Sequence, residues 1–98
     1  MKRLWTRFLP QLEERVAILH GAAAAVAEGT LSSEHRAQAI SAAHKLAGVL
    51  GTFGLAEGTD LAREAETFYS SELETDSATS ERLARIPLQL QAMFASRE

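Results

Sequence analysis

Apolar residues recur along the start of the chain at alternating steps of three and four positions, the spacing of one face of an α-helix. The residues of this stripe are Trp5, Phe8, Leu12, Val16, Leu19, Ala23 and Val26. Pro10 lies within the stripe. Either the helix begins near Pro10, where proline is tolerated in a first turn, or a short leading helix before Pro10 meets the long one at a kink. Gly29 is expected to end this helix.

A second stripe predicts a helix that runs approximately from Glu34 to Thr52. Ser32 or Ser33 can cap its start, and Gly54 is suited to ending it. The buried face of this helix is expected to consist of Ala39, Ala43, Leu46, Leu50 and Phe53.

Two further helices are predicted in the second half of the chain. The third should follow Gly54 directly, and its expected buried line is Gly58, Leu61, Ala65 and Phe68. The polar segment 70–80 should supply a loop, with Asp76 or Ser77 capping the next helix. The fourth helix is expected to bury Leu83, Ile86, Leu90, Met93 and Phe94. Pro87 predicts an interruption and a bend in it, because proline removes one backbone hydrogen bond.

Four amphipathic helices with short connections predict an all-α fold, an antiparallel up-down four-helix bundle. A chain of 98 residues has room for one core, so we expect a single domain over residues 1–98. Such a bundle buries its four stripes without a partner copy, which favours a monomer. The apolar content of 46%, rich in alanine and poor in β-branched residues, also favours close-packed helices.

Composition excludes several classes of function. The absence of cysteine rules out disulfides, thiolate zinc sites and a cysteine nucleophile, and it fits a cytoplasmic protein. No apolar run approaches the ~20 residues that span a bilayer, so we expect no membrane association. The net charge is −3: residues 1–49 hold six Lys/Arg and four Asp/Glu, and residues 50–98 hold four and nine. This distribution offers no basic stripe for a nucleic-acid backbone.

His44 is the candidate reactive residue. Successive helical residues rotate by ~100°, so His44 lies ~160° from Leu46, the centre of the buried face. The residues around it are small or uncharged: Ala37, Ser41, Gly48 and Gly51, with Ile40 and Ala47 on one flank and Lys45 on the other. A glycine inside a helix costs ~1 kcal/mol relative to alanine, so the vacated space should serve a purpose. Either another helix packs against Gly48 and Gly51 with His44 as a core polar group, or a partner approaches an exposed imidazole.

Other motifs give weaker signals. His20 and His35 are out of phase with His44, and no histidine pairing suggests a metal site. The glycine-rich segment 48–54 matches neither the dinucleotide nor the P-loop spacing, so the chain should not phosphorylate itself. Glu64 and Glu66 face different sides of their helix, which argues against paired-carboxylate catalysis.

The residues around His44 resemble the histidine-containing phosphotransfer (HPt) domain of multistep two-component signalling. The family pattern is histidine, any residue, leucine, usually lysine, then glycine, with another glycine further on. Here the pattern is met by His44, Leu46, Gly48 and Gly54, with Ala47 at the lysine position. The segment 54–66 resembles the family helix that flanks the histidine.

The resemblance implies that His44 accepts a phosphoryl group, assisted by Lys45 and Gly48. The chain would carry that group between aspartate-phosphorylated receiver domains of response regulators, and a hybrid histidine kinase is a further implied partner. The resemblance implies a phosphoryl carrier without autonomous kinase activity and without a cofactor or metal of its own, because Mg²⁺ would be held by the receiver. The receiver-binding surface would comprise Ala37, Ile40, Ser41, Ala47, Gly48 and Gly51, with Arg63 from the third helix.

Ala47 is a departure from the family, whose lysine lies near the phosphoryl group. Lys45, on the other flank of His44, could swing its ammonium toward a phosphate; alternatively, the partner supplies the cation. The same departure leaves open a non-catalytic HPt-like adaptor that binds a receiver or kinase without being phosphorylated. A dimerisation helix pair of a histidine kinase is a third reading, but there an acidic residue follows the histidine, and here Lys45 does.

Overall fold

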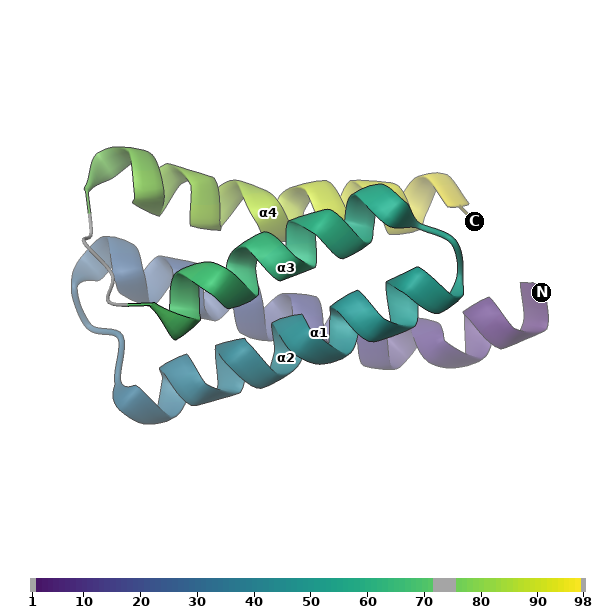
Figure 1. Ribbon diagram of the computed structural model, residues 1–98, viewed down its shortest axis with the longest axis horizontal. Helices are drawn as coiled ribbons and strands as arrows, with labels where there is room; N and C mark the ends of the chain where they lie inside the picture. Colours follow the sequence, from purple (N-terminus) through teal and green to yellow (C-terminus); the bar gives the residue numbers. More distant parts are fainter. Residues whose placement is uncertain (1, 72–75, 98) are drawn as a thin grey trace.

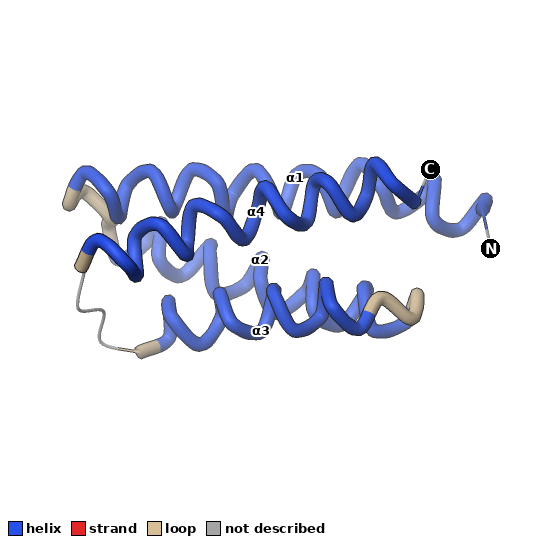
Figure 2. Tube along the Cα trace, turned by 90° about the horizontal axis from the view of Figure 1, so that it is seen from above, coloured by secondary structure: helices blue, strands red, loops and turns tan. Residues whose placement is uncertain are grey.

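The computed structural model describes residues 2–71 and 76–97, and within them it contains four helices and no strand (Figure 1). The helices are α1 (Lys2–Glu28), α2 (Ser33–Thr52), α3 (Ala56–Ser70) and α4 (Ser77–Arg97). They run alternately in opposite directions, so α1 begins and α4 ends at the same end of the bundle. Helix α2 packs against α3 and α1 against α4, and the two pairs face each other across the core (Figure 2). The predicted antiparallel four-helix bundle is confirmed.

Helix α1 continues through Pro10, so neither expectation about this proline was right. The helix does not start near Pro10, and the described residues before it form no separate helix. Trp5 and Leu12, on either side of Pro10, are buried in the same core, while Pro10 faces solvent. A proline inside a helix costs ~3 kcal/mol. Burial of each large apolar side chain stabilises the fold by ~1.5–3 kcal/mol. Burial of the stripe on both sides of Pro10 therefore outweighs the cost of the proline.

Two glycines end helices as the sequence predicts, because each adopts a left-handed backbone that other residues rarely adopt. Gly29 has φ 71° after α1, and Gly54 has φ 74° after α2. After α2, the amide of Leu55 donates to the carbonyl of Leu50 at 2.9 Å, which reverses the chain within a few residues. This tight turn sets α3 antiparallel to α2 and fixes which of their residues meet.

The buried apolar side chains form one core, which includes Trp5, Leu12, Val16, Leu19, Leu46, Leu50, Leu61, Leu83, Ile86, Leu90 and Phe94. The stripes predicted on all four helices therefore point inward. Three positions differ, because Phe8, Phe68 and Met93 are half-buried and pack against the core. Beside Phe68, the next residue, Tyr69, is buried. Burial raises the pKa of the Tyr69 hydroxyl to about 12, because the charged form would lose its hydration.

Helix α4 begins after the cap that the sequence predicts. The carboxylate of Asp76 accepts a hydrogen bond from the amide of Thr79 at 2.8 Å. The middle of the expected loop, residues 72–75, lies outside the described residues. The helix then continues to Arg97 without the interruption expected at Pro87, which is buried in the core. Core packing on both sides of Pro87 maintains the helix, as it does around Pro10.

Arg36 connects the start of α2 to the end of α3. Its Nε donates to the carbonyl of Tyr69 at 2.5 Å, and its Nη2 donates to the carbonyl of Ser71. The start of α2 is fixed by Ser32, whose hydroxyl accepts a hydrogen bond from the amide of His35 at 3.0 Å. The α2–α3 pair is thus held at one end by the Gly54 turn and at the other by Arg36.

None of the helices, over the residues described, is long and apolar enough to cross a membrane.

Candidate functional site

The side chain of His44 projects from the outer face of α2, with 75% of its surface exposed. Two positions on, Leu46 is fully buried, so the helix turns its apolar side inward and its imidazole outward, as the sequence predicts. The alternative, in which His44 is a polar group enclosed in the core, is wrong. The imidazole can be reached by a macromolecule from outside the bundle.

A carboxylate from the neighbouring helix holds one nitrogen of this imidazole. Nδ1 of His44 lies 3.0 Å from Oε2 of Glu66 on α3, and 29% of the Glu66 side chain is exposed. A carboxylate can only accept a hydrogen bond, so Nδ1 carries the hydrogen and donates it. The other nitrogen, Nε2, then has a free lone pair and no hydrogen-bond partner in the described part of the chain. This arrangement favours the tautomer in which the hydrogen is on Nδ1 and the lone pair is on Nε2.

Sequence reasoning missed Glu66, which it considered only together with Glu64. The two carboxylates do face different sides of α3, as expected, but each has a partner on another helix. Glu64 accepts a hydrogen bond from Nη2 of Arg82 on α4 at 2.7 Å, and this bond holds its pKa below the ordinary value. Glu64 therefore links α3 to α4, whereas Glu66 serves the exposed histidine.

The glycines next to His44 do not accommodate another helix. A Cβ atom placed on Gly48 would meet nothing within 4 Å, so the space beside His44 is open to solvent. On Gly51 a Cβ atom would make only an ordinary contact, 3.6 Å from the Thr59 hydroxyl. The alternative of close helix packing at Gly48 is thus wrong. The surface beside the imidazole at Gly48 is therefore bare and accessible.

His44 borders a shallow hollow between α2 and α3, which we call the imidazole hollow. Its lining residues are His44, Ala47 and Gly48 from α2 and Arg63, Glu66 and Thr67 from α3. It holds one imidazole, one carboxylate, one guanidinium and one hydroxyl.

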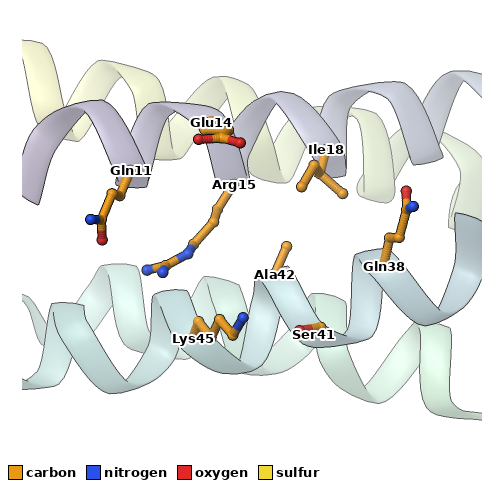
Figure 3. Close-up of a pocket in the computed structure, with 8 residues that line it drawn as sticks. All are labelled: Gln11, Glu14, Arg15, Ile18, Gln38, Ser41, Ala42 and Lys45. Carbon is orange, nitrogen blue, oxygen red and sulfur yellow. The ribbon is translucent and has the colours of Figure 1, made fainter.

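A second hollow lies on the other flank of α2, between α1 and α2, and we call it the α1–α2 groove (Figure 3). Helix α2 contributes Gln38, Ser41, Ala42 and Lys45, and α1 contributes Gln11, Glu14, Arg15 and Ile18. Figure 3 shows the side chains of Arg15 and Lys45 in the space between the two helices. Lys45 thus borders the α1–α2 groove, and Arg63 borders the imidazole hollow.

Comparison with known proteins assigns the family. A family model described as "Hpt domain" matches residues 3–96. The chain belongs to the Hpt domain family. Hpt domains carry phosphoryl groups in two-component signalling and interact with the receiver and kinase partners of phosphorelays.

One curated relative of this Hpt domain is Protein RcaC of Microchaete diplosiphon, 36% identical over 66 residues. The match covers 67% of this chain and 10% of the relative, so the chain spans about a tenth of that protein's length. No solved structure matches the chain.

The residues expected to bind a partner lie on α2 and α3 of the Hpt domain. Ala37, Ser41 and Gly51 are exposed, as is Arg63, and Ile40 is half-buried. Ala47 is 7% exposed, and its carbonyl accepts a hydrogen bond from the buried hydroxyl of Thr59 at 3.3 Å. Ala47 therefore contributes little surface of its own, although it borders the imidazole hollow.

The other two histidines of the Hpt domain lie apart from the imidazole hollow. His20 is exposed on α1, and His35 is half-buried near Gly21. Within residues 2–71 and 76–97, no three His, Cys, Asp or Glu residues gather as a metal-binding group.

Proposed function

We propose that this Hpt domain carries a phosphoryl group on His44 between aspartate-phosphorylated receiver domains. The observation that carries the proposal is the exposed imidazole, whose Nδ1 donates to Glu66 at 3.0 Å while Nε2 remains available. Neutral imidazole is a good nucleophile near neutral pH, and a carboxylate behind it favours the positive charge that develops on attack. The geometry of His44 thus suits attack on an electrophile that is brought by a docked partner.

The transfer would be an in-line displacement at phosphorus. The lone pair on Nε2 of His44 forms the new P–N bond, and the P–O bond to the receiver aspartate breaks. The aspartate leaves as a carboxylate with the bonding electrons. The hydrogen on Nδ1 stays in place, so the phosphorylated ring is an imidazolium next to the Glu66 carboxylate. Reversal of the same step passes the group to another receiver.

The surface around His44 fits a close approach by a folded partner. On α2 the residues Ala37, Ser41, Gly48 and Gly51 are exposed, and none of these four has a long side chain that must move aside. In-line transfer requires the reacting atoms to come within ~3–3.5 Å of each other. Long side chains around His44 would prevent this approach. We propose that receivers dock here and bring Mg²⁺ with them, and that the chain needs no metal of its own. Because receivers act in the cytoplasm, we place the Hpt domain there. We also expect it to act as a monomer.

The test is incubation of the protein with radiolabelled phospho-receivers. Wild-type protein should acquire acid-labile, alkali-stable label, and His44→Gln should acquire none. His20→Gln is the matched control, because His20 is also exposed and has no role in the proposed site. Failure of every receiver to label the wild-type protein would contradict the proposal, and so would full labelling of His44→Gln.

Ala47 gives specific support to a second candidate, a non-catalytic adaptor that binds a receiver or kinase. In this role the loss of the family lysine would have no consequence. Receiver binding that is unchanged in His44→Ala, together with no phosphate on the wild-type protein, would favour the adaptor.

A further inference from the structure

Arg63 is the cation that the structure places in the imidazole hollow. It lies on α3, three positions before Glu66, and such positions are neighbours on one helix face. Its side chain is exposed, and in the described part of the chain no hydrogen bond or ion pair engages it. Other arginines are committed to structure: Arg36 donates to carbonyls at the end of α3, and Arg82 donates to Glu64. The guanidinium of Arg63 remains available to a ligand.

The hollow needs such a cation once His44 is phosphorylated. A phosphoryl group brings ~2 negative charges at neutral pH, next to the carboxylate of Glu66. The family position for a lysine is occupied by Ala47, which has no charge. Lys45 borders the α1–α2 groove on the other flank of α2. Among the residues that line the imidazole hollow, Arg63 alone carries a positive charge.

We propose that Arg63 binds the phosphoryl group on His44 and replaces the absent lysine. The inference rests on the proposed phosphorylation of His44. A guanidinium presents several N–H donors in a planar fork that matches the oxygens of a phosphoryl group. Glu66 holds the imidazole from behind through Nδ1, while Arg63 reaches the phosphoryl group from α3. The positive charge therefore comes from the helix opposite His44 instead of from the same helix.

The test uses phosphoramidate, a small phosphoryl donor, so that receiver docking does not enter the measurement. Nε2 of His44 forms the P–N bond while the P–N bond of the donor breaks and ammonia leaves. Arg63→Ala should lower the rate of label incorporation by about 10- to 100-fold, because it removes a charge-assisted donor from the reacting group. Arg63→Lys should be intermediate. The matched control is Arg85→Ala, which removes an exposed arginine from α4 outside the hollow.

Restoring the family lysine gives a second measurement. Ala47→Lys in the Arg63→Ala background should recover at least part of the lost rate, because residue 47 borders the same hollow. Circular dichroism checks that each variant is folded, and Arg63→Lys supplies the rescue if Ala47→Lys does not fold.

Three results would separate the possibilities. Equal rates for Arg63→Ala and Arg85→Ala, with His44 labelled in both, would overturn the role of Arg63 and leave the proposed function intact. A defect of Arg63→Ala that appears with phospho-receivers but not with phosphoramidate would assign Arg63 to docking and would also overturn the inference. No label on the wild-type protein from either donor would refute the proposed function itself.

Discussion

The two hollows that flank α2 differ in what they place beside their charges. The α1–α2 groove holds Arg15 and Lys45 and therefore has more cationic side chains than the imidazole hollow. It contains no histidine. The imidazole hollow combines the proposed nucleophile, His44, with a carboxylate that accepts a hydrogen bond from it and with the guanidinium of Arg63, which no group in the described part of the chain engages. In the proposed function, reactivity therefore depends on the pairing of His44 with Glu66 between helices and not on the presence of a concave surface or of charge.

The largest effect should come from separating the imidazole from its carboxylate. Glu66→Ala removes the acceptor of the Nδ1 hydrogen, so the ring loses both its fixed tautomer and the partner of its developing charge. We expect phosphotransfer from a receiver to fall by about 10- to 100-fold, because orienting partners of functional imidazoles have effects of this size. Nitrogen NMR of His44 should show the hydrogen redistributed between Nδ1 and Nε2, and Glu66→Gln should recover part of the rate.

The control for this prediction is Glu64→Gln, which lies on the same helix but serves the Arg82 ion pair. It should leave transfer unchanged. If Glu64→Gln slowed transfer as much as Glu66→Ala, the distinction between the site and its scaffold would fail.

A smaller effect should follow from filling the open space beside the imidazole. Gly48→Ala adds a methyl group that meets nothing within 4 Å and improves the helix propensity of α2. The free energy of unfolding should rise by ~0.5–1 kcal/mol, measured by urea denaturation. Transfer from a receiver should nevertheless slow, by roughly 3- to 10-fold, because a displacement of ~1 Å between reacting groups is costly. The rate with phosphoramidate should not change.

Gly21→Ala on α1 is the matched substitution for Gly48→Ala. There an added Cβ would make ordinary contacts with the ring of His35, the nearest at 3.7 Å. It should also stabilise the protein, but without slowing transfer. Slower transfer in Gly21→Ala would show that added helix stability, and not lost access to His44, causes the effect.

The smallest effect should be found in the α1–α2 groove. Lys45→Ala removes a cation that is adjacent to His44 in sequence but lies on the other flank of α2. Since exposed charges are screened by water and salt, we expect the rate with phosphoramidate to change by less than about twofold. A loss as large as that of Arg63→Ala would mean that Lys45 reaches the phosphoryl group, and the two hollows would no longer be distinct in function.

The fold was predictable because each helix carries its own periodic signal. The stripes, the Gly54 turn and the Asp76 cap are local patterns, and the helices that they predict are present. The two prolines were misjudged for the opposite reason. Whether a helix continues through Pro10 or Pro87 depends on the burial of residues on both sides, which a local rule does not weigh.

The site was predictable only as far as one helix determines it. The exposure of His44 follows from its phase relative to Leu46 on α2. Glu66 is 22 positions away on α3, so its contact with Nδ1 depends on how α2 and α3 are aligned. That alignment comes from the Gly54 turn and the Arg36 hydrogen bonds, neither of which appears in a helical periodicity. The same limit applies to the cation near His44. The sequence favours Lys45, which is adjacent to His44, whereas Arg63 lines the imidazole hollow with His44 only because α3 packs on α2.

The anchoring of α2 to α3 at both ends has a consequence for how the protein can change. Arg36 and the Gly54 turn join α2 to α3, which carry His44 and Glu66, through contacts that involve no residue of α1 or α4. Substitutions on the outer faces of those two helices can therefore alter thermal tolerance or colloidal behaviour while each folded molecule keeps its reactivity. Adaptation to a new temperature and adaptation to a new signalling partner can proceed on separate parts of the chain.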